Sequence, residues 1–167
     1  DTAPRFERAL RIRFAHCDPA GIVFFPQYLV MFNGLVEDWF TEGLGVSYAE
    51  LLGPRRVGLP IVRLECDFSA ISRMGDDVVL GLSIARLGRS SLTLELDCRA
   101  GEQLRVASRQ VLVATSLETH RPIAFPPDVR NALAAFAPLP EPRSLDMQIL
   151  LPPGWPRPKG YSNGVSV

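Results

Sequence analysis

The sequence predicts an α+β domain in which one long helix lies across a curled antiparallel sheet of about five strands. Apolar residues alternate with charged ones near the N-terminus, a run with helical spacing follows, and four strand-like runs come after it. Short glycine-containing turns join the last three of these runs. Such turns connect antiparallel strands, because parallel strands need a long crossover. The fold class therefore follows from the order of the runs and the length of their connections.

The first strand is predicted over residues 10–14, where leucine, isoleucine and phenylalanine alternate with arginines. A long helix is predicted from about Pro26 to Glu42, because its apolar residues recur at intervals of three and four. Pro26 suits the first turn of a helix, where its missing N–H costs nothing. Gly43 is typical of the position just after a helix end.

A short helix and an interrupted strand are predicted next. Ser47 is placed to cap a helix over residues 48–52, which Gly53 would close. The run over residues 57–70 has the composition of a strand. Its alternation changes parity next to Pro60, which predicts a bulge or an edge strand.

Three more strands are predicted over residues 77–87, 90–99 and 103–115. In the middle one, leucines and a cysteine alternate with polar residues, so one face of the sheet is predicted to be buried. A terminal helix is predicted over residues 126–136, where apolar residues share one face.

The predicted elements all lie within residues 1–137, which we assign to one domain. Residues 138–167 hold seven of the fifteen prolines and are interpreted as a proline-rich tail or linker. A single sheet with one central helix leaves its other face and its edges uncovered. A homodimer, or a dimer of dimers, is therefore expected.

Composition excludes several classes of function. The 18 basic and 18 acidic side chains are intermixed, so no nucleic-acid partner is expected. The three cysteines match neither a disulfide framework nor a zinc site, which favours a cytoplasmic protein without a metal. No apolar run reaches the roughly 20 residues that span a bilayer, so no membrane partner is expected.

The junction between the first strand and the long helix has the features of a site. It places Asp18 and a Gly/Pro turn directly before the predicted helix start. A helix that begins at Pro26 leaves unpaired N–H groups and the positive end of its dipole facing this loop. A carboxylate beside such a position is half of an acyl-transfer centre. By itself, the pattern is more typical of an aspartate that caps a turn.

The junction contains the sequence Asp18-Pro19-Ala20-Gly21-Ile22-Val23-Phe24-Phe25-Pro26-Gln27-Tyr28. This run closely resembles the signature of the 4-hydroxybenzoyl-CoA thioesterase family of hot-dog folds. The resemblance extends over roughly residues 6–137 and includes 58–62, 75–78 and 87–91 in the family's order. It implies a hot-dog fold and hydrolysis of an acyl-CoA thioester with no metal and no bound cofactor. It also implies sites at a dimer interface.

The resemblance further implies that Asp18 is the catalytic carboxylate and that the backbone N–H at about Phe25 polarises the thioester carbonyl. Asp18 could attack the carbonyl directly or deprotonate a water, and the sequence does not distinguish these routes. Gly21 would let the backbone approach a ligand that a Cβ would block.

Further substrate contacts are predicted near this centre. His16 is interpreted as a donor to the substrate or an orienting group for Asp18, with a packed or surface histidine as the alternative. Phe24 and Tyr28 either line an aromatic acyl pocket or belong to the core. Pro60 lies in one of the family's supporting motifs and is included as a substrate contact.

Arg89, with Ser90 and Ser91, is the predicted contact for the CoA phosphates, because an arginine fork matches phosphate oxygens. A solvated arginine at the tip of a turn is the alternative. Residues 151–165 resemble the opening of a reactive-intermediate deaminase (Rid) family protein. The tail is therefore interpreted as the start of a fused domain or as a plain proline-rich segment.

The function predicted from these observations is an acyl-CoA thioesterase acting on an aromatic or other small acyl group. One alternative is a thioesterase of the same fold that acts on short-chain acyl-CoA or on acyl-carrier-protein thioesters. The other is a non-catalytic acyl-CoA binding module, which would not need a carboxylate facing the carbonyl.

Overall fold

The structure, a computed structural model, describes residues 4–138. No helix within this range is long and apolar enough to cross a bilayer. The elements of this range are, in chain order, β1 (Phe6–Arg11), η1 (Phe14–His16), α1 (Pro26–Asp38), η2 (Trp39–Gly43), α2 (Tyr48–Leu52), β2 (Val57–Gly58), β3 (Ile61–Phe68), β4 (Asp77–Leu87), β5 (Ser91–Ala100), β6 (Gln103–Val113), β7 (Thr115–Ser116) and α3 (Pro127–Phe136).

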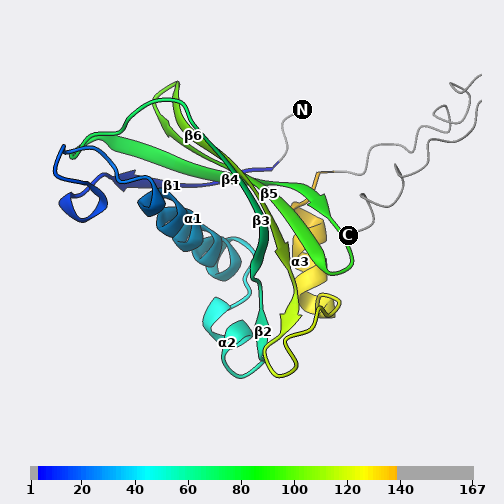
Figure 1. Cartoon of the computed structure of the whole chain (residues 1–167). Coiled ribbons are helices and arrows are strands. Elements are labelled where there is room, and N and C mark those ends of the chain that lie inside the picture. The colour runs from blue at the N-terminus through cyan, green and yellow to red at the C-terminus, as the bar shows by residue number, and fades with distance from the viewer. Residues whose placement is uncertain (1–3, 139–167) are drawn as a thin grey trace, which may run out of the picture.

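Five strands form one antiparallel sheet in the order β1-β4-β5-β6-β3, and β2 pairs with β7 in a small separate ribbon. The sheet curves around α1 (Figure 1). This arrangement confirms the predicted α+β fold, with one long helix against five antiparallel strands. The proline-rich tail and its Rid-like sequence lie outside the described residues.

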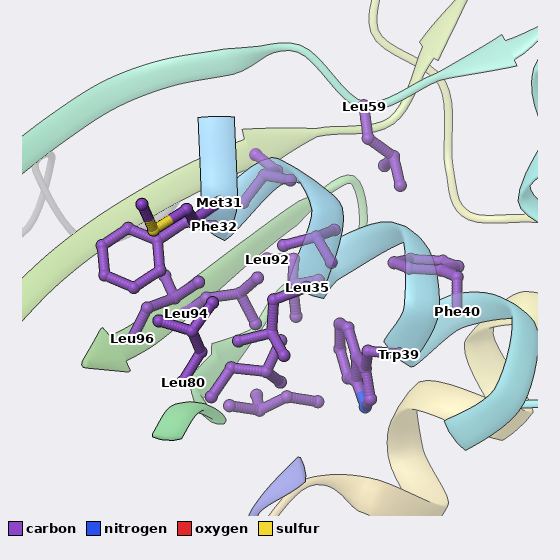
Figure 2. Packing of buried hydrophobic residues seen from close by; sticks show 14 of the residues in the cluster. Met31, Phe32, Leu35, Trp39, Phe40, Leu59, Leu80, Leu92, Leu94 and Leu96 are labelled. Atoms are coloured by element: carbon purple, nitrogen blue, oxygen red, sulfur yellow. The ribbon is translucent and has the colours of Figure 1, made fainter. Parts of the chain in front are cut away.

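The hydrophobic core lies between α1 and the inner face of the sheet (Figure 2). The central side chains of α1, η2 and β5 are each at most 2% exposed: Phe32, Leu35, Trp39, Leu92, Leu94 and Leu96. Burying one such side chain stabilises a fold by about 1.5–3 kcal/mol. The same contacts fix α1, and hence its N-terminus, relative to the sheet.

The first strand differs from the prediction. β1 ends at Arg11, and the side chain of Phe14 is 81% exposed. Ile12 is buried as expected, but the chain then turns, and His16 N–H donates to Arg13 O (2.9 Å). The predicted strand therefore shares only residues 10 and 11 with β1: the prediction missed residues 6–9 and is wrong beyond Arg11, where the chain leaves the sheet and forms a single 3-10 turn at residues 14–16.

The long helix and the interrupted strand follow the prediction more closely. α1 continues into η2, a π-helical turn that ends at Gly43. The parity change at Pro60 coincides with the gap between β2 and β3 and with a register shift between Ile61 and Arg63. β3 is also an edge strand, and apart from Cys66 all its residues are exposed. Both the predicted bulge and the predicted edge are confirmed.

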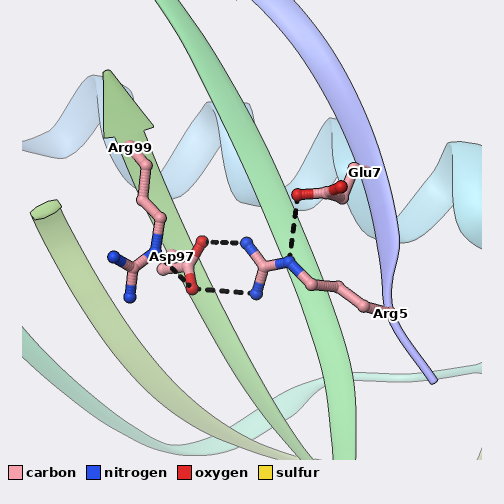
Figure 3. A network of polar contacts seen from close by, with 4 residues as sticks. All are labelled: Arg5, Glu7, Asp97 and Arg99. Carbon is pink, nitrogen blue, oxygen red and sulfur yellow. Dashed lines mark hydrogen bonds and ion pairs between the residues drawn. The ribbon is translucent and has the colours of Figure 1, made fainter. Parts of the chain in front are cut away.

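An ion-pair network links β1 to β5 on the outer face of the sheet (Figure 3). Arg5 Nη1 donates to Asp97 Oδ2 (2.9 Å), Arg5 Nη2 also bonds Asp97, and Arg5 Nε donates to Glu7 (3.0 Å). The guanidinium passes over Gly81 of β4, where an added Cβ would collide with it. Glycine at position 81 thus leaves room for a contact between two strands that are not neighbours.

Candidate active site

Asp18 lies in a tight hairpin between η1 and α1. The hairpin is closed by the bridge between Cys17 and Val23 and by Asp18 N–H, which donates to Ile22 O (3.0 Å). Asp18 Oδ1 accepts a hydrogen bond from Ala20 N–H (2.8 Å). Within the described part of the chain, Oδ2 accepts none. One carboxylate oxygen therefore caps the turn, and the other is available to a ligand.

Gly21 occupies the point where the hairpin reverses direction. Its N–H donates to Asp18 O (2.9 Å), and its carbonyl accepts from Met74 N–H (3.0 Å). Its φ is +77°, a value that glycine adopts readily and other residues rarely do. An added Cβ would meet no atom within 4 Å, so backbone conformation rather than space requires glycine in the free protein.

We expect Gly21→Ala to destabilise the fold by about 1–2 kcal/mol, because the left-handed conformation carries this cost for L residues. Gly34→Ala is the matched control. Gly34 lies within α1, and a Cβ there also meets no atom within 4 Å. In a helix, alanine is favoured over glycine by about 1 kcal/mol. Urea unfolding of both variants checks this prediction, and equal stabilities would contradict it.

The start of α1 offers a free backbone donor. The N–H groups of Phe24, Gln27 and Tyr28 all donate to carbonyls of the hairpin or of the first turn. Pro26 has no N–H. Among residues 4–138, none accepts a hydrogen bond from Phe25 N–H. This donor sits at the N-cap of α1, where the positive end of the helix dipole strengthens its attraction for a negatively charged oxygen.

Phe24 and Tyr28 have opposite surroundings. Phe24 is 50% exposed, and its ring centroid lies 5.6 Å from that of Phe25, edge to face. Phe25 lies 6.0 Å from Phe68, at the end of β3. We call Phe24, Phe25 and Phe68 the aromatic patch. Tyr28 is only 3% exposed and belongs to the core, so of its two predicted roles the structure supports packing.

His16 lines a groove of about 300 Å³ between α1 and β1, together with Gln27 and Met31. Its Nδ1 accepts a hydrogen bond from Arg13 N–H (2.9 Å), so the neutral ring carries its proton on Nε2. Its carbonyl accepts from Phe24 N–H (2.9 Å), which ties it to the start of α1. The contacts seen in residues 4–138 include none between the His16 ring and Asp18, so the structure does not support the orienting role.

Arg89, Ser90 and Ser91 lie far from Asp18 within one chain. Arg89 and Ser90 lie in the turn after β4 and Ser91 begins β5, whereas the Asp18 hairpin contacts the loop before β4 (Figure 1). β4 has 11 residues, and a rise of about 3.4 Å per residue separates the two ends by roughly 35 Å. Arg89 is exposed, whereas Ser91 is 4% exposed. One chain therefore does not bring the predicted phosphate contact to the predicted carboxylate.

Pro60 lines a different groove, of about 610 Å³, between α1 and the connection from β2 to β3. Asn33 and Glu37 of α1 line the same groove. This groove is distinct from the groove beside His16, and Val30 and Gly34 of α1 border both. Pro60 is thus not adjacent to Asp18 within one chain.

Sequence reasoning missed two groups of residues near the hairpin. Gln27 and Met31 line the groove beside His16, and the helical period of α1 could have placed them on one face. Phe68 completes the aromatic patch from a strand distant in sequence. No local signal in the sequence links it to the helix start.

A curved sheet around one helix, with a free carboxylate oxygen and a free N–H at the helix start, has the architecture of a hot-dog thioester hydrolase. The chain belongs to the thioesterase-like superfamily, whose model matches residues 12–133. The matched range contains the Asp18 hairpin, α1 and strands β3 to β6.

Two relatives match over most of the chain. A 1,4-dihydroxy-2-naphthoyl-CoA hydrolase from Synechococcus sp. (strain CC9605) is 30% identical over 139 residues, which are 80% of this chain and 93% of the relative. A gentisyl-coenzyme A thioesterase structure has a TM-score of 0.70 and 28% identity, covering 77% of this chain and 99% of its own.

The fold is also shared with a 1,4-dihydroxy-2-naphthoyl-CoA thioesterase from Synechocystis, with a TM-score of 0.71 at 23% identity. That match covers 78% of this chain and 96% of the other. The chain is therefore an acyl-CoA thioesterase of the hot-dog fold.

Proposed function

We propose that this enzyme hydrolyses aromatic acyl-CoA thioesters, with Asp18 and the Phe25 N–H as its reacting groups. The observation that carries the proposal is that two polar groups are unused, one in the hairpin and one at the helix start that follows it. Asp18 Oδ2 and Phe25 N–H are both left without a partner in the described chain, while the groups around them are hydrogen-bonded. Hydrolysis of a thioester needs a group that attacks the carbonyl carbon or activates a water, and a donor that stabilises the carbonyl oxygen.

In the proposed reaction, the carbonyl oxygen accepts a hydrogen bond from Phe25 N–H as negative charge develops on it. Donors of this type typically lower the barrier by about 2.7–4 kcal/mol. Asp18 then either attacks the carbonyl carbon or removes a proton from an attacking water. Direct attack expels the CoA thiolate and leaves a mixed anhydride, which water hydrolyses to the acid. Isotopically heavy water in a single turnover labels the Asp18 carboxylate only by direct attack.

An aromatic acyl group is favoured by the surfaces next to these two groups. The aromatic patch exposes two rings at the helix start, and aromatic rings attract one another beyond their burial by about 0.5–1.5 kcal/mol. The groove beside His16, about 300 Å³, is at the lower end of the size of ligand pockets, about 300–1,000 Å³. The names of the relatives, naphthoyl-CoA and gentisyl-CoA enzymes, support the same substrate class.

A second copy of the chain is proposed to complete the site. Among residues 4–138, no strand pairs with the outer edge of β3, which exposes Ile61, Val62, Leu64 and Phe68, and an edge of this kind favours pairing with another strand. A two-fold axis normal to the sheet reverses the strand direction. It would therefore bring the Arg89 turn of one copy to the end of the sheet that holds Asp18 of the other.

A thiol-release screen tests the substrate class. It compares benzoyl-, hydroxybenzoyl-, phenylacetyl- and short aliphatic CoA esters, each with and without a chelator. We expect kcat/KM for the best aromatic ester to exceed that for acetyl-CoA at least about tenfold, the lower end of the discrimination that a single methylene gives in a hydrophobic pocket. We expect no effect of the chelator. A preference for aliphatic esters, or for carrier-protein thioesters, would contradict the aromatic assignment.

A further inference from the structure

Arg105 of β6 holds the loop between β3 and β4, residues 69–76. Its Nη1 donates to Ile71 O (2.7 Å), Ser72 Oγ (3.2 Å) and Asp76 Oδ2 (2.9 Å). The Arg105 side chain is 12% exposed, so these contacts are largely shielded from water. One nitrogen thus fixes the loop at three points along its length.

The same loop carries the Asp18 hairpin. Val23 N–H donates to Ser72 O (2.9 Å), and Met74 N–H donates to Gly21 O (3.0 Å). Between these two bonds, residue 22 forms a bridge with residue 73. The hairpin is therefore hydrogen-bonded along one side to residues that Arg105 holds in place.

Asp76, the acidic partner of Arg105, helps to hold the loop of residues 69–76 in place. Asp76 Oδ2 also accepts a hydrogen bond from Arg73 N–H (2.9 Å), and Asp76 O accepts from Ile12 N–H (2.8 Å). The Arg73 N–H and the Arg105 guanidinium hold the pKa of Asp76 below its ordinary value. Asp76 is consequently charged at neutral pH, and it ties the C-terminal end of the loop to Arg105 and to Ile12, which precedes the hairpin.

We propose that Arg105 is a positioning residue for catalysis: by fixing the loop of residues 69–76, it sets the place of the Asp18 carboxylate relative to the start of α1. The proposal rests on the proposed function, because it takes Asp18 as the reacting carboxylate. Arg105 itself acts only through the loop. A displacement of about 1 Å between reacting groups can cost about 100-fold in rate, so a distant clamp of this kind affects turnover strongly.

The test uses Arg105→Met, which keeps an unbranched, partly apolar side chain but removes the guanidinium and all its donors. We expect kcat for the preferred aromatic ester to fall about 10- to 100-fold, with KM within about threefold of the original. Arg105→Lys should recover most of the loss, because a single nitrogen makes all three contacts and an ammonium group has three donors.

The matched control is Arg109→Met. Arg109 lies on the same strand and pairs with Glu95 (3.0 Å), but on the exposed outer face of the sheet. Its removal should leave kcat unchanged. Asp76→Asn gives an independent route to the same loop, and a kcat loss in the same direction is expected. If Arg105→Met does not fold, Asp76→Asn takes its place in the double-substitution experiment with Asp18→Asn.

Combining Arg105→Met with Asp18→Asn separates positioning from general damage. If Arg105 acts through Asp18, the substitution causes no further loss of kcat once Asp18 is neutral. A loss of the same size in both backgrounds would overturn the proposal, as would a kcat within twofold of the original in Arg105→Met. Asp18→Asn alone reports on the proposed function: if it leaves kcat intact, the assignment of Asp18 fails first.

Discussion

Asp18→Asn is expected to lower kcat by about 100- to 10,000-fold with little change in KM. Asparagine keeps an oxygen that can accept the hydrogen bond from Ala20 N–H, so the hairpin should retain its shape. It lacks the negative charge needed to attack a carbonyl or to take a proton from water. Steady-state thiol release with the preferred ester measures this effect.

The control for that substitution is Asp128→Asn. Asp128 lies at the start of α3 and pairs with Arg55 (2.7 Å) at the surface, so it offers the same change of charge away from the hairpin. Its kcat should match that of the original enzyme. A normal kcat in Asp18→Asn would contradict the proposed mechanism. Tight acyl-CoA binding without turnover in the unaltered chain would instead favour a binding module.

Phe25→Pro is expected to lower kcat by about 100- to 1,000-fold, because it deletes the proposed oxyanion donor. A backbone N–H cannot be removed by changing a side chain, except by proline. The φ of Phe25 is −51°, within the range that a proline ring allows. Since no acceptor for this N–H occurs in the described chain, the substitution breaks no observed hydrogen bond.

Phe25→Ala distinguishes the donor from the ring. It removes the same aromatic side chain from the patch but keeps the N–H, so we expect its kcat to stay well above that of Phe25→Pro. Circular dichroism of both variants checks that α1 is intact. Equal kcat values in the two variants would show that the ring matters and the N–H does not, which would contradict the proposed oxyanion site.

Elements with local signals were predicted well. The bounds predicted for α2 agree with the structure, because Ser47 Oγ accepts from Glu50 N–H (3.3 Å) and this cap is encoded within four residues. β4 likewise spans the predicted residues 77–87. The end of β1 was not predicted, because alternation persists to Phe14 while the turn depends on contacts with a loop some 60 residues later.

In the candidate site, too, residues with a local sequence signal could be predicted and residues placed by distant contacts could not. Asp18, Gly21 and the helix start are contiguous in sequence, so their proximity could be predicted from the motif alone. Arg105 could not be identified, because it contacts Ile71 and Asp76 across 34 and 29 residues. The separation of Arg89 from Asp18 could not be predicted either, because it depends on contacts of the Asp18 hairpin with the loop before β4.

A newly made chain exposes the edge of β3 until it associates with a partner. Open main-chain groups beside Ile61, Val62 and Leu64 are a template for uncontrolled stacking of strands as well as for the correct partner. If a second copy covers this edge, folding and association become one thermodynamic process. Dilution then lowers the stability of the folded state. A high concentration of newly made chains favours aggregation unless the correct pairing of two copies through β3 is fast.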